Sequence, residues 1–420
     1  MGKRKRRLRY TGADLTSHFP IAKGDVVELR LGAHADDGSP VAEYEGAPVS
    51  VMGGLAGERV QAEITWINKQ GLHARVTAVL EASPHRVPAP CTYFLDCTGC
   101  QWQHVSYDHQ LELKRDRVIA AMSEYEVLES YGVEPVIGSP AQLGYRNHAR
   151  FTVARWPENR GQVGYMNAVT RRFVKTDRCL LMNEPINDVL GRVQGRLGGM
   201  SQFSVRASAR TGSTLIQPPL PAGPGLPTSG QTHYEESVSG YRFRVASPSF
   251  FQVNVAQLER MADEVRVMLE LDGEGTLLDA YCGVGTFAAI LAPHVSRVLA
   301  IEESASAIQD ALRNSDGLED VEFIQGKSEA VMPGLAGEVD YVILDPPRAG
   351  CMPEALDALR RMQPRRVVLV SCETEAMARD QARMIANGFR LERIQPVDMF
   401  PQTRHIEVLS LFSGSPAVAG

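Results

Sequence analysis

A thiol and a carboxylate near the C-terminus could carry covalent chemistry. The apolar run from Arg366 predicts a buried strand over residues 366–372 that ends in Cys372, and Glu407 lies in a later apolar stretch, two positions after His405. A thiol attacks as its thiolate, which makes up only a few per cent of an ordinary cysteine at neutral pH. In a strand, His405 and Glu407 would share one face. We predict Cys372 as a nucleophile and Glu407 as a proton acceptor, although each alone would more often be a packing cysteine or a solvated carboxylate.

A glycine-rich turn indicates a cofactor site. The strand predicted over residues 276–280 runs into a turn that contains Gly283 and Gly285, and a helix is expected to begin near Thr286. Glu302 ends the next predicted strand, where an acid can bind two ribose hydroxyls, and Asp345 ends the fourth. The dinucleotide fingerprint G-x-G-x-x-G is incomplete because position 288 is Ala. NAD therefore remains an alternative, but S-adenosylmethionine fits better.

Four other cysteines have the spacing of metal ligands. Cys91, Cys97 and Cys100 form a C-x5-C-x2-C run, and Cys179 follows after 78 intervening residues. The chain has 7 cysteines, and in the cytoplasm these favour metal binding or catalysis over disulfides. Four thiolates suit a 4Fe-4S cluster. Zinc is the alternative, although it usually takes cysteines as two C-x2-C-like pairs.

Elements that alternate between strand and helix must position these groups. Predicted strands over residues 276–280, 297–302, 321–325, 341–345 and 366–372 are mostly separated by helical segments. This pattern predicts a doubly wound, mainly parallel α/β sheet, in which ligands bind beyond the carboxyl ends of the strands. We expect four regions: a basic arm over 1–15, a small β-barrel over 16–84, a mainly β central domain over 85–245, and the α/β domain over 246–420.

Composition and charge narrow the class of protein. The chain has 420 residues, 44% of them hydrophobic and 22% charged, which is typical of a multidomain globular protein. No apolar run is long enough for a membrane helix, and the basic start is not followed by an apolar segment, so we expect a cytoplasmic protein. The net charge is −6, yet residues 1–10 hold six Lys or Arg, and residues 144–178 hold eight Lys or Arg against two acids. A solvated basic face is one reading of these stretches, and RNA phosphate binding is the other.

Together these residues resemble the RNA (uracil-5-)-methyltransferase family, especially its iron–sulfur 23S rRNA branch, over nearly the whole chain. The resemblance implies a Rossmann-like class I methyltransferase domain, an N-terminal OB-like RNA-binding barrel called TRAM, and a central domain that binds a 4Fe-4S cluster. It also assigns roles by motif: Cys91, Cys97, Cys100 and Cys179 as cluster ligands; Gln252, Tyr281, Thr286, Glu302 and Asp345 as S-adenosylmethionine contacts; Cys372 as nucleophile; and Glu407 as base. The chain departs from the family where Glu373-Thr374 replaces the usual Asp-Pro after the nucleophile.

The resemblance implies S-adenosylmethionine-dependent methylation of uridine C5 in RNA, which forms 5-methyluridine through a covalent Cys–C6 adduct. Its favoured substrate is 23S rRNA, with the tRNA T-loop as the alternative, and no obligate protein partner or membrane is expected. Two alternatives from other classes remain at this stage. They are an NAD-dependent oxidoreductase and a non-catalytic RNA-binding or redox-sensing iron–sulfur protein.

Overall fold

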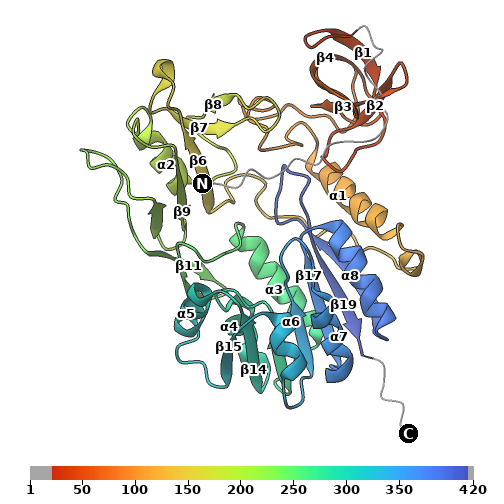
Figure 1. The fold of residues 1–420 in the computed structure, drawn as a ribbon, viewed down its shortest axis with the longest axis vertical. Helices are drawn as coiled ribbons and strands as arrows, with labels where there is room; N and C mark the ends of the chain where they lie inside the picture. Colours follow the sequence, from red (N-terminus) through yellow and green to blue (C-terminus); the bar gives the residue numbers. More distant parts are fainter. Residues whose placement is uncertain (1–20, 415–420) are drawn as a thin grey trace. The chain divides into compact units, whose positions relative to one another are not determined.

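The computed structural model describes residues 21–414. The predicted basic arm and the first five residues of the predicted barrel lie outside this range. The chain divides into two compact units (Figure 1). The first unit holds the described residues up to Gln110 together with Met166–Val174 and Gln402–Arg404, and the second holds the remainder. No helix within the described range is long and apolar enough to cross a membrane.

The first unit contains a five-stranded sheet in the order β1-β4-β5-β3-β2. The strands are β1 (Val26–Arg30), β2 (Val41–Tyr44), β3 (Ala47–Met52), β4 (Arg59–Asn68) and β5 (Gly71–Glu81). Buried and exposed residues alternate along β1, where Val27 and Leu29 face the core of the sheet. The chain just after β1 is also hydrogen-bonded to β2, the strand at the opposite edge of the sheet. Gly32 N–H donates to Val41 O (2.8 Å), and Val41 N–H donates to Ala33 O (2.9 Å).

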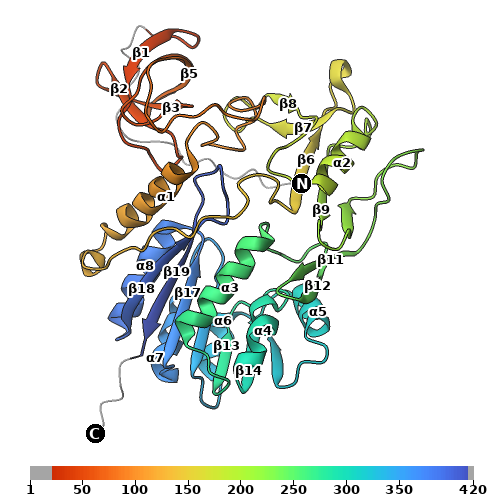
Figure 2. The ribbon, with the colours of Figure 1, turned by 180° about the vertical axis from the view of Figure 1, so that it is seen from behind.

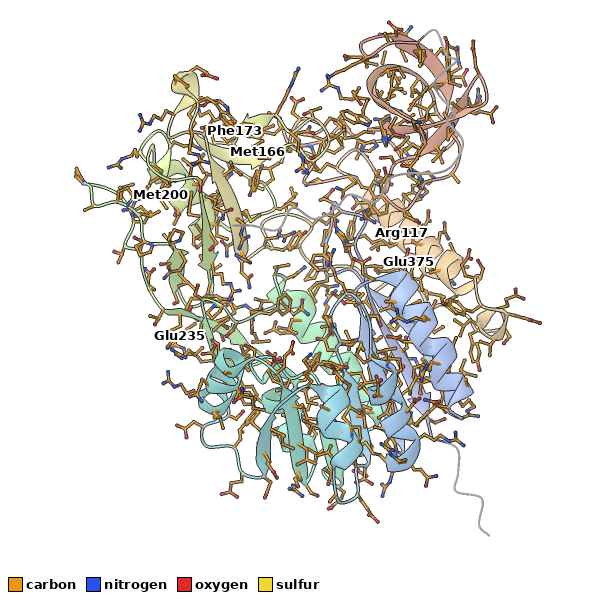
Figure 3. All side chains as sticks on the ribbon, viewed as in Figure 1. Arg117, Met166, Phe173, Met200, Glu235 and Glu375 are labelled. Atoms are coloured by element: carbon orange, nitrogen blue, oxygen red, sulfur yellow. The ribbon has the colours of Figure 1, made fainter. Side chains whose placement is uncertain are left out.

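The second unit begins within α1 (Tyr107–Met122), which is followed by the short 3₁₀ helix η1 (Glu126–Leu128). A sheet in the order β10-β9-β6-β7 comes next, and α2 (Glu184–Val193) packs on one face of it through a core that includes Phe151, Ile186 and Phe203. Its strands are β6 (His148–Val153), β7 (Val163–Met166), β9 (Gln202–Ala207) and β10 (Thr214–Gln217), with η2 (Pro157–Asn159) between β6 and β7 and β8 (Phe173–Lys175) after β7. In Figure 3, Met200 lies just before β9, and Glu235 lies on the hairpin of β11 (His233–Val238) and β12 (Tyr241–Ala246).

A seven-stranded sheet forms the rest of the second unit, in the order β15-β14-β13-β16-β17-β19-β18. Its strands are β13 (Thr276–Asp279), β14 (Arg297–Glu302), β15 (Val321–Gln325), β16 (Tyr341–Leu344), β17 (Arg366–Ser371), β18 (Arg390–Val397) and β19 (Glu407–Ser413). The first five in sequence are parallel, and β19 runs antiparallel to both β17 and β18. The doubly wound, mainly parallel sheet is thus confirmed, and three of the five predicted strands end one residue earlier than expected.

Helices cover both faces of this sheet (Figure 2). On one face pack α3 (Val255–Leu269), α4 (Thr286–Leu291) and α5 (Ala305–Asn314); on the other pack α1, α7 (Pro353–Met362) and α8 (Thr374–Ala386). The remaining short helices are η3 (Ala292–His294), α6 (Ser328–Val331) and η4 (Met332–Gly334). Because the central strands are covered on both sides, β17 is a continuous apolar run in which Val367 and Val368 are both 0% exposed.

Candidate active site

Strand direction brings the predicted reactive residues to one edge of the seven-stranded sheet. Asp345 and Cys372 directly follow the parallel strands β16 and β17, so both lie at the carboxyl edge. Glu407 begins β19, whose register pairs Val408 with Ser371. The antiparallel pairing therefore places the thiol and the carboxylate at the same edge. The expectation that His405 shares a strand face with Glu407 is wrong, since β19 begins only at Glu407.

The glycine turn has room for a ligand on one side and close packing on the other. Gly283 (φ +55°) and Gly285 (φ +80°) both adopt the left-handed conformation. A Cβ on Gly285 would lie 3.2 Å from Ala311 Cβ, whereas a Cβ on Gly283 would meet nothing within 4 Å. Glu302 orders the turn from the next strand, because its carboxylate accepts from the N–H groups of Gly283 (3.0 Å) and Ser304 (2.7 Å).

Sequence reasoning did not assign a role to Asp279, which ends β13 and is 0% exposed. Its Oδ2 accepts from Ala288 N–H (3.2 Å), but its Oδ1 is buried and has no hydrogen-bond partner within residues 21–414. The sequence feature that could have identified Asp279 is its position at a predicted strand end, just before the glycine turn. An unsatisfied acceptor beside open space at Gly283 fits a bound S-adenosylmethionine.

The other predicted cofactor residues lie around the same strand ends or lead into α3. Thr286 is the first residue of α4, and Tyr281, two residues before Gly283, is half-buried. Gln252 lies just before α3, and its carbonyl accepts from Asn147 Nδ2 (3.0 Å). Gln252 is thus held by its backbone, which leaves the role of its side chain as a prediction.

Burial and like charge perturb the groups at this edge. Burial raises the pKa of Asp345 to about 7. Burial, with a smaller contribution from Asp345, raises the pKa of Glu407 well above its usual range. The pKa of Cys372 rises to about 12, first through burial and then through Glu407 and Asp345, while Arg348 acts in the opposite direction. Such a cluster of perturbed groups is typical of a functional site.

Arg348 and Glu373 are two further charged residues at the site. They form an ion pair with Nη1 and Oε1 3.1 Å apart. Arg348 lowers the pKa of Cys372, and Glu373 raises it. Glu373 stands where the family usually has Asp, so the acid next to the predicted nucleophile is kept, and here it is paired with Arg348.

The remaining cysteines fall into two groups. Cys282 and Cys351 are 6% and 5% exposed and pack in the apolar cores. Cys91, Cys97 and Cys100 lie in a loop of the first unit, and Gln103 bridges it by donating to Cys100 Sγ (3.1 Å) and accepting from Cys91 N–H (3.2 Å). Cys179 belongs to the second unit. None of the seven cysteines, all within the described range, forms a disulfide.

A metal site is not evident from side-chain geometry alone. Across residues 21–414, no three or more His, Cys, Asp or Glu side chains are arranged to hold a metal ion. The four thiols remain a chemically suitable donor set, and the cluster stays a prediction.

Comparisons with known proteins identify the family to which the chain belongs. The family model for tRNA (Uracil-5-)-methyltransferase matches residues 237–339 and 336–413. The chain is 32% identical to an uncharacterized RNA methyltransferase of Gloeobacter violaceus, covering 94% of this chain and 98% of that protein. It is 31% identical to one of Chlorobaculum tepidum, covering 93% and 96%.

A solved structure supports the same fold. The tRNA (uracil-54, C5)-methyltransferase of Pyrococcus abyssi, crystallised with S-adenosyl-L-homocysteine, matches with a TM-score of 0.74 and 23% identity, over 92% of this chain and 99% of that one. These matches favour methyl transfer over the NAD-dependent and non-catalytic alternatives. The chain therefore belongs to the RNA uracil-5 methyltransferase family and is an S-adenosylmethionine-dependent RNA (uracil-C5)-methyltransferase.

Proposed function

We propose that Cys372 and Glu407 are the nucleophile and the base of this methyl transfer. Uracil C5 is a weak nucleophile, so Cys372 Sγ adds to C6 and the C5–C6 electron pair moves into an enolate that makes C5 carbanion-like. S-adenosylmethionine, when bound, supplies the electrophilic methyl group that C5 takes up. Glu407 then accepts the C5 proton, the C5–H electrons restore the C5–C6 double bond, and the thiolate leaves.

The observation that carries this proposal is the β17–β19 register, which pairs Ser371 with Val408. This pairing sets the residue after β17 and the first residue of β19 at one sheet edge. Glu407 is 4% exposed, so water is largely excluded from its carboxylate. A raised pKa makes a carboxylate a stronger base, which suits removal of a carbon-bound proton.

Two variants test the assignment. Cys372→Ala should abolish methylation, because it removes the nucleophile. RNA binding should be retained, because the thiol acts in the reaction and is not needed for binding. Glu407→Gln should accumulate a denaturation-resistant protein–RNA adduct, because the methylated adduct cannot lose its C5 proton. Complete turnover by Cys372→Ala, or no adduct with Glu407→Gln, would refute the respective role.

For the cofactor, we propose Gln252, Tyr281, Thr286, Glu302 and Asp345 as the binding residues. Glu302 already accepts two backbone N–H bonds, and a carboxylate has further lone pairs for ribose hydroxyls. Asp345 adds negative charge at the edge where a cationic cofactor would bind. Titration calorimetry with S-adenosyl-L-homocysteine should show weakened binding for Glu302→Gln.

For the RNA, we propose 23S rRNA, with a target uridine extruded from a loop. Residues 16–84 would form a TRAM barrel, a proposal supported by the bonds that join the chain after β1 to β2. Trp66 on β4 is 52% exposed, as expected of a ring that stacks on an RNA base. Mapping 5-methyluridine in rRNA and tRNA from cells with and without the gene separates 23S rRNA from the tRNA T-loop.

We also propose that Cys91, Cys97, Cys100 and Cys179 hold a structural 4Fe-4S cluster within a central domain over residues 85–245, and we assign it no step of the reaction. Anaerobically purified protein should be brown and contain iron and sulfide. Cys179→Ser should lose iron, whereas the control Cys351→Ala, at a buried packing position, should keep it. Stoichiometric zinc without iron would overturn the assignment.

A further inference from the structure

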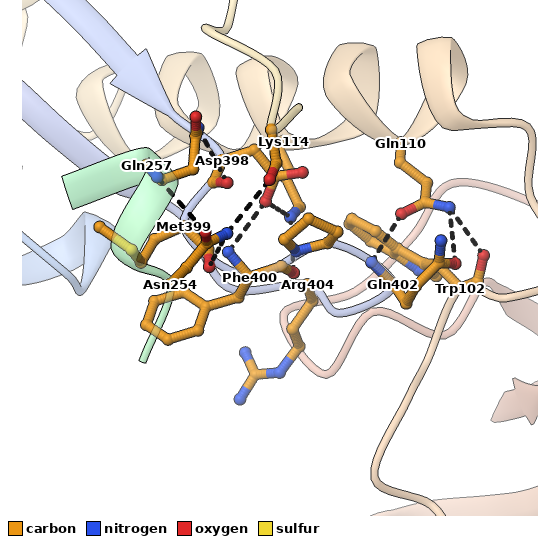
Figure 4. Close-up of polar contacts among 12 residues, drawn as sticks. Trp102, Gln110, Lys114, Asn254, Gln257, Asp398, Met399, Phe400, Gln402 and Arg404 are labelled. Carbon is orange, nitrogen blue, oxygen red and sulfur yellow. Dashed lines mark hydrogen bonds and ion pairs between the residues drawn. The ribbon is translucent and has the colours of Figure 1, made fainter. Parts of the chain in front are cut away.

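Side-chain hydrogen bonds hold the chain that follows β18, and Figure 4 shows those from Lys114, Asn254 and Gln257. Four consecutive carbonyl oxygens, from Asp398 to Pro401, each accept from a different side chain. The donors are Gln257 Nε2 to Asp398 O (3.1 Å), Asn254 Nδ2 to Met399 O (3.3 Å), Lys114 Nζ to Phe400 O (3.0 Å) and Tyr145 Oη to Pro401 O (3.0 Å). Side-chain donors to four successive carbonyls restrict a segment that lies between β18 and β19, and one backbone bond, from Asp398 N–H to Ile137 O (2.9 Å), adds to them.

The strongest of these contacts is a buried ion pair. Lys114 and Asp398 both have side chains that are 0% exposed, and Lys114 Nζ donates to Asp398 Oδ1. The same Oδ1 accepts from Phe400 N–H (3.1 Å), so the pair closes a tight turn after β18. Burying two charges has a large desolvation cost, and apolar replacements are often equally stable. The pair is therefore better explained by the geometry it imposes than by stability.

This segment begins beside the proposed base. Val397, the last residue of β18, pairs directly with Glu407, the first residue of β19. Asp398 thus follows the residue opposite Glu407, and a shift of the Asp398–Pro401 segment would move the end of the strand pair on which Glu407 lies.

The same contacts reach the proposed cofactor side. Asn254 is two residues after Gln252, and its Oδ1 caps α3 by accepting from Gln257 N–H (3.3 Å). Its Nδ2 donates to Met399 O, and Gln257 Nε2 also donates to Ile137 O (3.0 Å). One short segment, residues 252–257, therefore carries a proposed cofactor contact and two donors to the chain beside Glu407.

We infer that Lys114, Tyr145, Asn254 and Gln257 are positioning residues that hold the Asp398–Pro401 segment and thereby orient Glu407 for removal of the C5 proton. This inference rests on the proposed function, because it acts through the base. Loss of a donor should slow proton abstraction without weakening RNA binding or formation of the Cys372–C6 bond.

The smallest test is Tyr145→Phe, which removes one hydroxyl and keeps the ring. Its control is Tyr234→Phe, because the Tyr234 hydroxyl is also buried but has no hydrogen-bond partner in the described part of the chain. We expect Tyr145→Phe to lower kcat up to about tenfold at unchanged KM for RNA, as one hydrogen bond allows, and the control to behave as wild type. A second variant, Lys114→Met/Asp398→Leu, replaces the ion pair by apolar side chains and should slow elimination on the order of 100-fold.

The decisive readout is the kinetic isotope effect with RNA that contains 5-deuterated uridine. Slower proton abstraction should raise the isotope effect and the steady-state adduct in the positioning variants, whereas a general loss of structure would lower activity without changing either. Wild-type isotope effects and adduct levels in Tyr145→Phe would overturn the inference, even if the double variant fails to fold. If the wild-type protein itself forms no adduct, the proposed function fails and the inference fails with it.

Discussion

Asp279→Asn should stabilise the ligand-free protein, and the gain should increase with pH. Asp279 is 0% exposed, and its pKa is raised from 3.8 to about 8, first by burial and then by Asp345. Below pH 3.8 the carboxyl is protonated in both states and has no effect. Between the two pKa values the unfolded chain ionises while the folded protein stays protonated, so stability falls as pH rises and the loss is complete above about pH 8.

The size of the effect follows from the gap between the two pKa values. At about 1.4 kcal/mol per pKa unit, the wild-type carboxyl costs about 1.5 kcal/mol at pH 5 and about 5 kcal/mol at pH 8 in a rigid site. Local relaxation and water entry reduce such penalties, so these values are upper bounds. Asn is neutral at every pH and retains an oxygen for Ala288 N–H, so the variant avoids this cost.

Urea denaturation of the ligand-free protein at pH 5 and pH 8 measures the effect. The matched control is Asp310→Asn, because Asp310 is also 0% exposed but is ion-paired with Arg244. Breaking that buried pair should destabilise the protein by about 3–5 kcal/mol. An Asp279→Asn gain that is equal at both pH values, or a loss like that of the control, would refute the reasoning.

Three further predictions follow from the same structure. Binding of the cationic cofactor should favour the ionised form of Asp279, which then releases its proton, so cofactor affinity should rise from pH 6 to pH 8. Calorimetry in buffers of different ionisation enthalpy would measure the number of protons released. Gly285→Ala should lower the melting temperature more than Gly283→Ala, because both are strained at positive φ but only Gly285 would place its Cβ 3.2 Å from a neighbouring Cβ. Arg86→Met should lower the free energy of unfolding by about 3 kcal/mol, because it removes the ion-pair partner of the fully buried Glu58. Arg30→Met breaks an exposed ion pair with Glu81 and should lower it by less than about 1 kcal/mol; thermal unfolding measures both.

Local sequence patterns were sufficient to predict the parallel strands of the seven-stranded sheet. Apolar runs between turn residues mark β13, β14, β16 and β17, because strands covered on both faces need few polar positions. β15 lies at the edge of the sheet and keeps two polar residues, Glu322 and Gln325. The edge strands were harder to predict. β2 has only four residues, and β18 is mostly polar in its first half and contains Pro396, so neither has a strong strand signal.

The sequence by itself determined which chemistry-bearing residues follow which strands, and hence that Asp345 and Cys372 lie at a carboxyl edge. Only the tertiary structure decided that β19 inserts antiparallel beside β17, which brings Glu407 to the same edge. It also decided that Lys114 pairs with Asp398 across 284 residues of sequence. The physical reason is that turn and strand preferences act between neighbours, whereas burial and pairing depend on which distant segments the whole chain brings together.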